Sequence, residues 1–134
     1  MATRTANAKR RTRADHAAET AEDYVEAMVE LADAAGDCRV TDLAGHFGVS
    51  HVTVIRIVRR LAGEGLVETA PYQPVRLTAA GRRLATASAE RHATVYAFLR
   101  KLGVDARTAA VDAEGIEHHL SPATLRRMRR FLGR

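Results

Sequence analysis

The sequence of 134 residues has no tryptophan, and aromatic residues make up only 4% of it. A core of this composition must consist mainly of alanine, leucine and valine. The single cysteine cannot form a disulfide within the chain, and it fits a reducing cytoplasm. No apolar run approaches the roughly 18 residues of a membrane span. The basic N-terminal residues lack the apolar stretch of a secretory signal. We therefore expect a cytoplasmic protein without membrane contact.

Alanine is abundant, with 26 residues, and β-branched runs are few. This composition favours a mainly helical fold. Apolar spacing and capping residues predict helices at about 15–35, 40–47, 51–62, 78–102, 105–119 and 122–132, the second of them capped by Thr41. Two short β-type runs, residues 66–69 and 75–77, flank a turn with two prolines and predict a hairpin.

The basic residues are distributed unevenly. Residues 1–14 carry five basic side chains and no acidic one, whereas the rest of the chain is electrically balanced. Of the 21 lysines and arginines, 19 are arginine, the side chain best suited to bidentate phosphate contacts. Residues 1–14 also lack apolar periodicity, so we predict a flexible basic arm there. Such an arm on a neutral body suggests a nucleic-acid partner, although many charged segments are simply solvated.

Residues 40–68, VTDLAGHFGVSHVTVIRIVRRLAGEGLVE, have the spacing of a helix-turn-helix. Ala44 is the small residue in the first helix, and Gly48 lies at the turn. We expect Val52, Ile55 and Val58 to face the core from the second helix. The hairpin that follows makes this a winged helix-turn-helix. The alternative is an ordinary helical hairpin with solvated arginines.

The second helix of this motif would place its first turn against base edges in the major groove of double-stranded DNA. Its arginines would reach bases or phosphates. The candidate DNA-binding residues are Ser50, His51, Val52, Thr53, Arg56, Arg59 and Arg60.

Carboxylates and histidines form three clusters elsewhere in the chain. Asp23 and Glu26 share one helix face, and so do the members of a second cluster at i, i+3 and i+4. The second cluster consists of Glu114, Glu117 and His118, and His92 lies alone on the long helix. Four carboxylates and two imidazoles suit a pair of divalent cations. Each cluster taken singly also fits an exposed charge or an ordinary histidine. Cys38 lies outside this set, and we expect it to be a small buried residue.

The segments EDYVE (22–26), LTAAG (77–81), ERH (90–92) and DAEGIEHHLS (112–121), together with the helix-turn-helix, resemble the diphtheria-toxin-repressor family. The resemblance covers residues 15–125 and is strongest to the manganese-responsive branch. It implies a winged helix-turn-helix DNA-binding domain (residues 15–80) followed by a helical metal-binding and dimerisation domain (81–134). It also implies a homodimer that represses metal-uptake genes when it is loaded with metal.

The same resemblance implies a two-metal site on six residues of this chain. They are Asp23, Glu26, His92, Glu114, Glu117 and His118. Iron-responsive relatives have methionine in place of Asp23 and cysteine in place of Glu114. Because carboxylate replaces sulfur here, we expect the metal to be Mn²⁺, with Fe²⁺, Co²⁺ or Zn²⁺ able to substitute. The two-metal site implies two ions per subunit.

The sequence thus predicts a manganese-responsive DNA-binding transcriptional regulator and not an enzyme. Three alternatives stay open. One is an Fe²⁺-responsive regulator of the same family, and another is a winged-helix regulator that binds a small organic effector in an aromatic pocket. The third is a dinuclear metallohydrolase, which would need an open coordination position and a substrate cleft.

Overall fold

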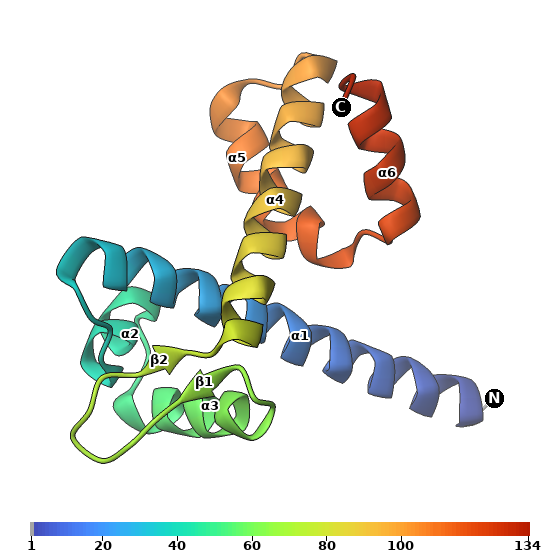
Figure 1. The fold of residues 1–134 in the computed structure, drawn as a ribbon. Helices are drawn as coiled ribbons and strands as arrows, with labels where there is room; N and C mark the ends of the chain where they lie inside the picture. The colour runs from blue at the N-terminus through green and yellow to red at the C-terminus, as the bar shows by residue number, and fades with distance from the viewer. Residues whose placement is uncertain (1) are drawn as a thin grey trace. The chain divides into compact units, whose positions relative to one another are not determined.

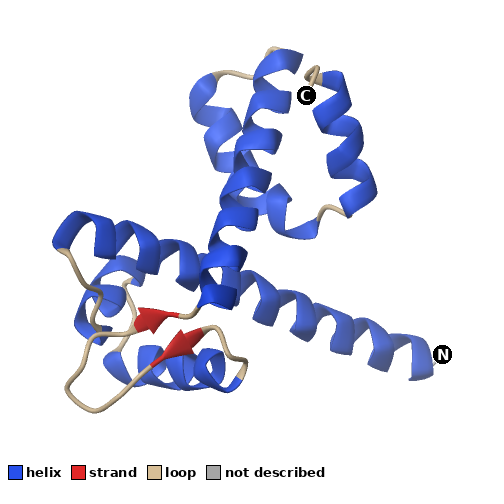
Figure 2. Ribbon diagram, in the orientation of Figure 1, coloured by secondary structure: helices blue, strands red, loops and turns tan. Residues whose placement is uncertain are grey.

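The computed structural model describes the backbone of residues 2–134 and the side chains of residues 15–134. Its elements are mainly helices, with one short antiparallel hairpin (Figures 1 and 2). In chain order they are α1 (Ala2–Ala35), α2 (Val40–Phe47), α3 (His51–Gly63), β1 (Val67–Glu68), β2 (Arg76–Leu77), α4 (Ala79–Leu102), α5 (Ala106–Ile116), the 3₁₀ helix η1 (Glu117–His119) and α6 (Pro122–Phe131). The helices within this range are all too short or too polar to cross a bilayer.

The chain divides into two compact units. One is Thr20–Thr86, which holds the end of α1, the helices α2 and α3 and the hairpin. The other combines the residues up to Glu19 with Ala87–Arg134. Both α1 and α4 contribute residues to each unit. We call them the winged-helix unit and the C-terminal unit.

Helix α1 is longer than predicted. The sequence placed its start near Asp15, but the helix begins at Ala2, so this prediction is wrong. Residues 2–14 contain neither glycine nor proline, and several of them are alanine or arginine, which favour helix. Their lack of apolar periodicity means only that they have no face to bury. The side chains of residues 1–14 lie outside the described part of the structure.

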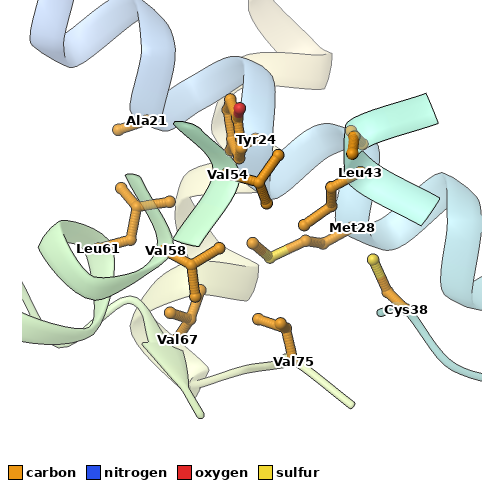
Figure 3. Close-up of a cluster of buried hydrophobic side chains, with 12 residues drawn as sticks. Ala21, Tyr24, Met28, Cys38, Leu43, Val54, Val58, Leu61, Val67 and Val75 are labelled. Carbon is orange, nitrogen blue, oxygen red and sulfur yellow. The ribbon is translucent and has the colours of Figure 1, made fainter. Parts of the chain in front are cut away.

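The core of the winged-helix unit is formed by one face of α1 packed on α2, α3 and the hairpin (Figure 3). Tyr24 and Met28, one turn apart, contribute from α1, and the Tyr24 ring stacks on Phe47 with centroids 4.4 Å apart. Cys38 is 1% exposed, so its predicted burial is confirmed. Burial, with Asp42 and Asp37 nearby, raises the pKa of the Cys38 thiol to about 11. A thiol of this kind is inert at neutral pH.

Helices α2 and α3 form the predicted helix-turn-helix. The turn is possible because Gly48 adopts a left-handed conformation with φ 64°, which residues with a side chain rarely adopt. Helix α2 begins after Arg39 and not after Thr41, the predicted cap. The reason is that Asp42 accepts a hydrogen bond from the backbone N–H of Arg39, 2.9 Å away, and this closes the first turn.

The buried stripe of α3 differs from the predicted one. Val54, Val58 and Leu61 are buried, whereas Val52 is 76% exposed and Ile55 37% exposed. The predicted burial of Val52 and Ile55 is therefore wrong. Apolar residues fill most positions of the segment VTVIRIV, so spacing alone permits more than one stripe. Packing on α1 and α2 selects the stripe at i, i+4 and i+7.

The hairpin is confirmed, although its strands are only two residues long. Val67 pairs with Leu77 and Glu68 with Arg76. Helix α4 starts directly after β2, where Thr78 Oγ1 donates to the Gly65 carbonyl at 2.7 Å and accepts from the Gly81 N–H at 3.1 Å. A Cβ atom on Gly81 would lie 2.1 Å from the Leu66 carbonyl oxygen. This close approach explains why the LTAAG segment ends in glycine.

The C-terminal unit packs the second half of α4 against α5 and α6. Its core contains Val95 of α4, Ala113 of α5 and Leu125 of α6. Helix α6 begins as predicted, with Pro122 in the first turn and Ser121 Oγ accepting from the Thr124 N–H at 3.2 Å.

Helix α5 was predicted to continue to His119, but the α-helix ends at Ile116 and Glu117–His119 form a 3₁₀ turn. A physical reason lies just downstream. Proline disfavours helical geometry in the residue before it, and Ser121 is extended with ψ 156°. The chain therefore has to leave the helix before Ser121.

Candidate nucleic-acid interface and metal centre

The outward face of α3 carries His51 and Val52 in its first turn and arginines further along. His51, Val52, Arg56 and Arg59 are exposed, and no acidic residue occurs in the helix. Thr53 is partly buried. Together with Ser50, the exposed N-cap residue, five of the seven predicted DNA-binding residues are thus exposed on α3 and its cap. Such a surface can contact both base edges and phosphates.

Ser50 and Thr53 cap the N-terminal end of α3. Ser50 Oγ accepts from the Thr53 N–H at 3.2 Å, as the predicted N-cap should, and lies 3.0 Å from Thr53 Oγ1. Both hydroxyls keep lone pairs or hydrogens for a further partner. Their first role is to fix the orientation of the first turn of α3.

Arg60 is placed differently from Arg56 and Arg59. It is partly buried, and its Nε lies 3.7 Å from Glu64 Oε1. Burial raises the pKa of the Tyr24 hydroxyl, and the nearby Arg60 charge opposes this shift. Because Arg60 lies near α1, it is less available for DNA than the two other arginines.

The tip of the hairpin adds an exposed aromatic residue that is not among the predicted DNA-binding residues. Tyr72 is 97% exposed and has φ 61°. Arg39 Nη1 donates to its carbonyl oxygen at 3.5 Å. The signal in the sequence was an aromatic residue between two prolines, Pro71 and Pro74.

Four of the six predicted metal ligands come together in the C-terminal unit. His92 Nδ1 of α4 lies 2.9 Å from Glu117 Oε2 and 4.0 Å from Glu114 Oε1. His118 Nε2 lies 3.4 Å from Glu117 Oε1. Glu117 therefore stands between two imidazoles, with one carboxylate oxygen toward each.

Burial of these four side chains differs strongly. Those of Glu117 and His118 are 2% exposed, that of His92 is 32% exposed and that of Glu114 is 69% exposed. Burying a carboxylate is costly unless positive charge or hydrogen bonds accompany it. A buried glutamate beside two imidazoles is an arrangement that a divalent cation would stabilise. Both buried groups lie on the 3₁₀ turn, a common ending of an α-helix, which follows α5 directly.

The two remaining predicted ligands, Asp23 and Glu26, lie on α1 in the winged-helix unit. Both are partly buried. Glu26 Oε1 is fully buried and has no hydrogen-bond partner among the side chains described for residues 15–134. An orphaned buried carboxylate oxygen fits a cation ligand, because a cation would satisfy it.

One acidic residue beside this set was missed. Glu19 lies on α1 four residues before Asp23, and its Oε2 is 3.6 Å from His119 Nε2 of η1. The signal in the sequence was this i−4 spacing, which puts the two carboxylates on one helix face.

The sequence matches two family models. The model described as iron dependent repressor, N-terminal DNA binding domain, matches residues 16–75. The model of the iron dependent repressor metal binding and dimerisation domain matches residues 78–134. A transcriptional regulator named MntR from Escherichia coli O6:H1 is 45% identical over 122 residues, which are 91% of this chain and 79% of that protein. The chain belongs to the iron-dependent repressor family.

Membership in this repressor family confirms the resemblance that the motifs indicated, and it confirms the predicted fold class. A regulator also named MntR, from Listeria welshimeri, is 36% identical over 100 residues, 75% of this chain and 70% of that protein. The solved structure of a manganese-dependent transcriptional repressor in complex with manganese is 32% identical and has a TM-score of 0.74. The manganese regulator SloR is 26% identical, with a TM-score of 0.72. Both alignments cover 84% of this chain, which spans about half of those chains, 52% and 53%.

Proposed function

We propose that this chain is a manganese-responsive transcriptional regulator. As a homodimer in the cytoplasm, without enzymatic activity, it binds operator DNA and represses metal-uptake genes when loaded with Mn²⁺. The observation that carries the proposal is the buried Glu117 between His92 and His118, on a chain that also has an exposed basic recognition helix. The named relatives support it, and so does the match to the DNA-binding and metal-binding models.

In this proposal six residues hold the metal: Asp23, Glu26, His92, Glu114, Glu117 and His118. Their donor atoms are oxygen and nitrogen without sulfur, which suits Mn²⁺. Bound metal supplies positive charge that offsets the repulsion among the carboxylates. Glu117 is best placed to hold metal beside both imidazoles, since each of its carboxylate oxygens already faces one of them.

The coupling between metal and DNA follows from the two faces of α1. Tyr24 and Met28 of this helix pack in the winged-helix core, while Asp23 and Glu26 occupy neighbouring positions of the same helix. Residues on α1 that ligate metal therefore act on the same rigid element that supports α3. We propose that metal fixes the two recognition helices of the dimer roughly one DNA turn apart. The proposed domain boundaries remain 15–80 and 81–134.

The alternative of a small-molecule effector calls for an aromatic pocket, which the described cavity of the winged-helix unit does not provide. The winged-helix unit has a cavity of about 550 Å³ near the end of α1 and β2, lined by 13 residues that include Cys38 and Arg82. None of these lining residues is aromatic. The Fe²⁺ alternative differs only in the activating metal, so the experiment below includes that ion.

The decisive test is DNA binding with and without metal. Labelled DNA from the promoter of the source organism's manganese-transporter gene is titrated with the full chain in Mn²⁺, in anaerobic Fe²⁺ and in EDTA. A scrambled duplex of equal length serves as control. We expect tight binding to the promoter only with metal, and more strongly with Mn²⁺ than with Fe²⁺. Equal binding with EDTA would contradict metal control, and equal binding to both duplexes would contradict operator recognition.

The proposed stoichiometry is two Mn²⁺ ions per subunit. Isothermal titration calorimetry of the metal-free protein, or the paramagnetic resonance of added Mn²⁺, counts the bound ions directly. Saturation at one ion per subunit would reduce the proposal to a mononuclear site. Tighter Zn²⁺ or Co²⁺ binding would not contradict it, because these ions generally bind such sites more strongly than Mn²⁺.

A further inference from the structure

Glu19 is an acidic residue of α1 that lies close to η1. Its side chain is 29% exposed, and its Oε2 lies 3.6 Å from Nε2 of His119. A ligand atom of Glu19 also lies within 4.8 Å of a ligand atom of His118, whose side chain is 2% exposed. These three residues belong to the same compact unit.

These distances are compatible with a shared cation. Ligand atoms lie about 2.0–2.1 Å from Mg²⁺ and about 2.3–2.6 Å from the larger Ca²⁺, so two ligands on opposite sides of a divalent ion are about 4–5 Å apart. A carboxylate oxygen of Glu19 and a nitrogen of His118 fall within that limit. Asp23 follows Glu19 by one helical turn, so both carboxylates leave the same face of α1.

We propose that Glu19 belongs to the metal centre as a seventh residue, supplying a further carboxylate from α1 next to His118. The inference rests on the proposed function. In this arrangement the His119 ring holds one oxygen of Glu19, and the other oxygen is available to the cation. A second contact of this kind orients a ligating carboxylate. His119 thereby positions a metal ligand, although it lies outside the predicted ligand cluster.

The competing explanation is that Glu19 only forms a surface ion pair with His119, which is 53% exposed. Pairs at such sites contribute little to stability. The two explanations differ in one respect. If Glu19 contacts the cation, removing its charge weakens Mn²⁺ binding far more than removing His119 does.

The experiment compares Mn²⁺ affinity by calorimetry in the full-length wild type and three variants, Glu19→Gln, His119→Gln and Glu30→Gln. Glu30 lies on the same helix and is exposed, so it controls for the loss of one negative charge. We expect Glu19→Gln to weaken Mn²⁺ binding at least roughly 10–100-fold, because loss of a residue that only supports a metal ligand already costs that much. His119→Gln should weaken it less, and Glu30→Gln should leave it unchanged. The melting temperature of the metal-free Glu19→Gln protein should equal that of the wild type.

Three outcomes would overturn the inference. If Glu19→Gln binds Mn²⁺ as tightly as Glu30→Gln, Glu19 is outside the centre while the proposed function stands. If His119→Gln reproduces the whole loss, Glu19 acts only through the ion pair. If the wild type binds no Mn²⁺, the proposed function falls and takes this inference with it.

Discussion

Gly81 has no room for a side chain, although it lies in a helix. An added Cβ would lie 2.1 Å from the backbone oxygen of Leu66 and 3.0 Å from Leu77 Cδ2. We expect Gly81→Ala to destabilise the protein by about 1–3 kcal/mol, because backbone must shift to relieve the overlap. Chemical denaturation of the metal-free protein measures the change.

Gly45 in α2 is the matched control for this substitution. A Cβ there meets nothing within 4 Å, so Gly45→Ala gains helix propensity and should stabilise by up to about 1 kcal/mol. The two variants should therefore shift the free energy of unfolding in opposite directions. A neutral Gly81→Ala would mean that α4 can move away from the Leu66 backbone at no cost.

At the scale of elements, α3 presents Arg56 and Arg59 outward while Arg60 lies near Glu64 and Tyr24. If Arg56 reads a base, Arg56→Ala should weaken operator binding by about 1–3 kcal/mol and affect random DNA much less. The measurement is fluorescence anisotropy with operator and scrambled duplexes at several salt concentrations.

Arg107 of α5 provides a control with the same change in charge, since it is exposed and lies outside the helix-turn-helix. Arg107→Ala should leave operator binding nearly unchanged. An equal loss of operator and random binding in Arg56→Ala, with a lower salt slope, would reassign Arg56 to a phosphate contact.

At the scale of the whole molecule, the identity of the metal should decide when DNA is bound. Glu114→Cys and Asp23→Met replace carboxylates by sulfur, which disfavours Mn²⁺ relative to Fe²⁺ or Co²⁺. Neither change touches α3, so operator preference should stay the same. We expect Mn²⁺ to lose efficacy in promoting operator binding relative to Fe²⁺ or Co²⁺. Metal and DNA affinities should remain coupled by roughly 1–3 kcal/mol.

Glu114→Gln separates loss of the carboxylate from gain of sulfur. It should lower the efficacy of every metal, whereas Glu114→Cys should change their order. Full operator binding by both sulfur variants in EDTA would contradict the role of these residues in the switch.

Features that depend only on neighbouring residues can be read from the order of the amino acids. Ser50 and Ser121 act as helix caps because a cap needs only a hydroxyl three residues before an N–H. The helix-turn-helix followed from Gly48 and the apolar spacing around it. The types of the proposed metal ligands were likewise readable, since carboxylate and imidazole chemistry is a property of the residues themselves.

Tertiary structure decided what depends on distant contacts. The segment VTVIRIV permits several buried stripes, and only packing on α1 and α2 selected Val54 and Val58. Glu114 and Glu117 were equivalent in the helical pattern. In the structure the Glu114 side chain is 69% exposed, whereas that of Glu117, on the 3₁₀ turn, is 2% exposed. The meeting of Glu19 with His119 joins residues 100 positions apart. Local spacing cannot encode such differences, because burial and proximity depend on how the whole chain packs.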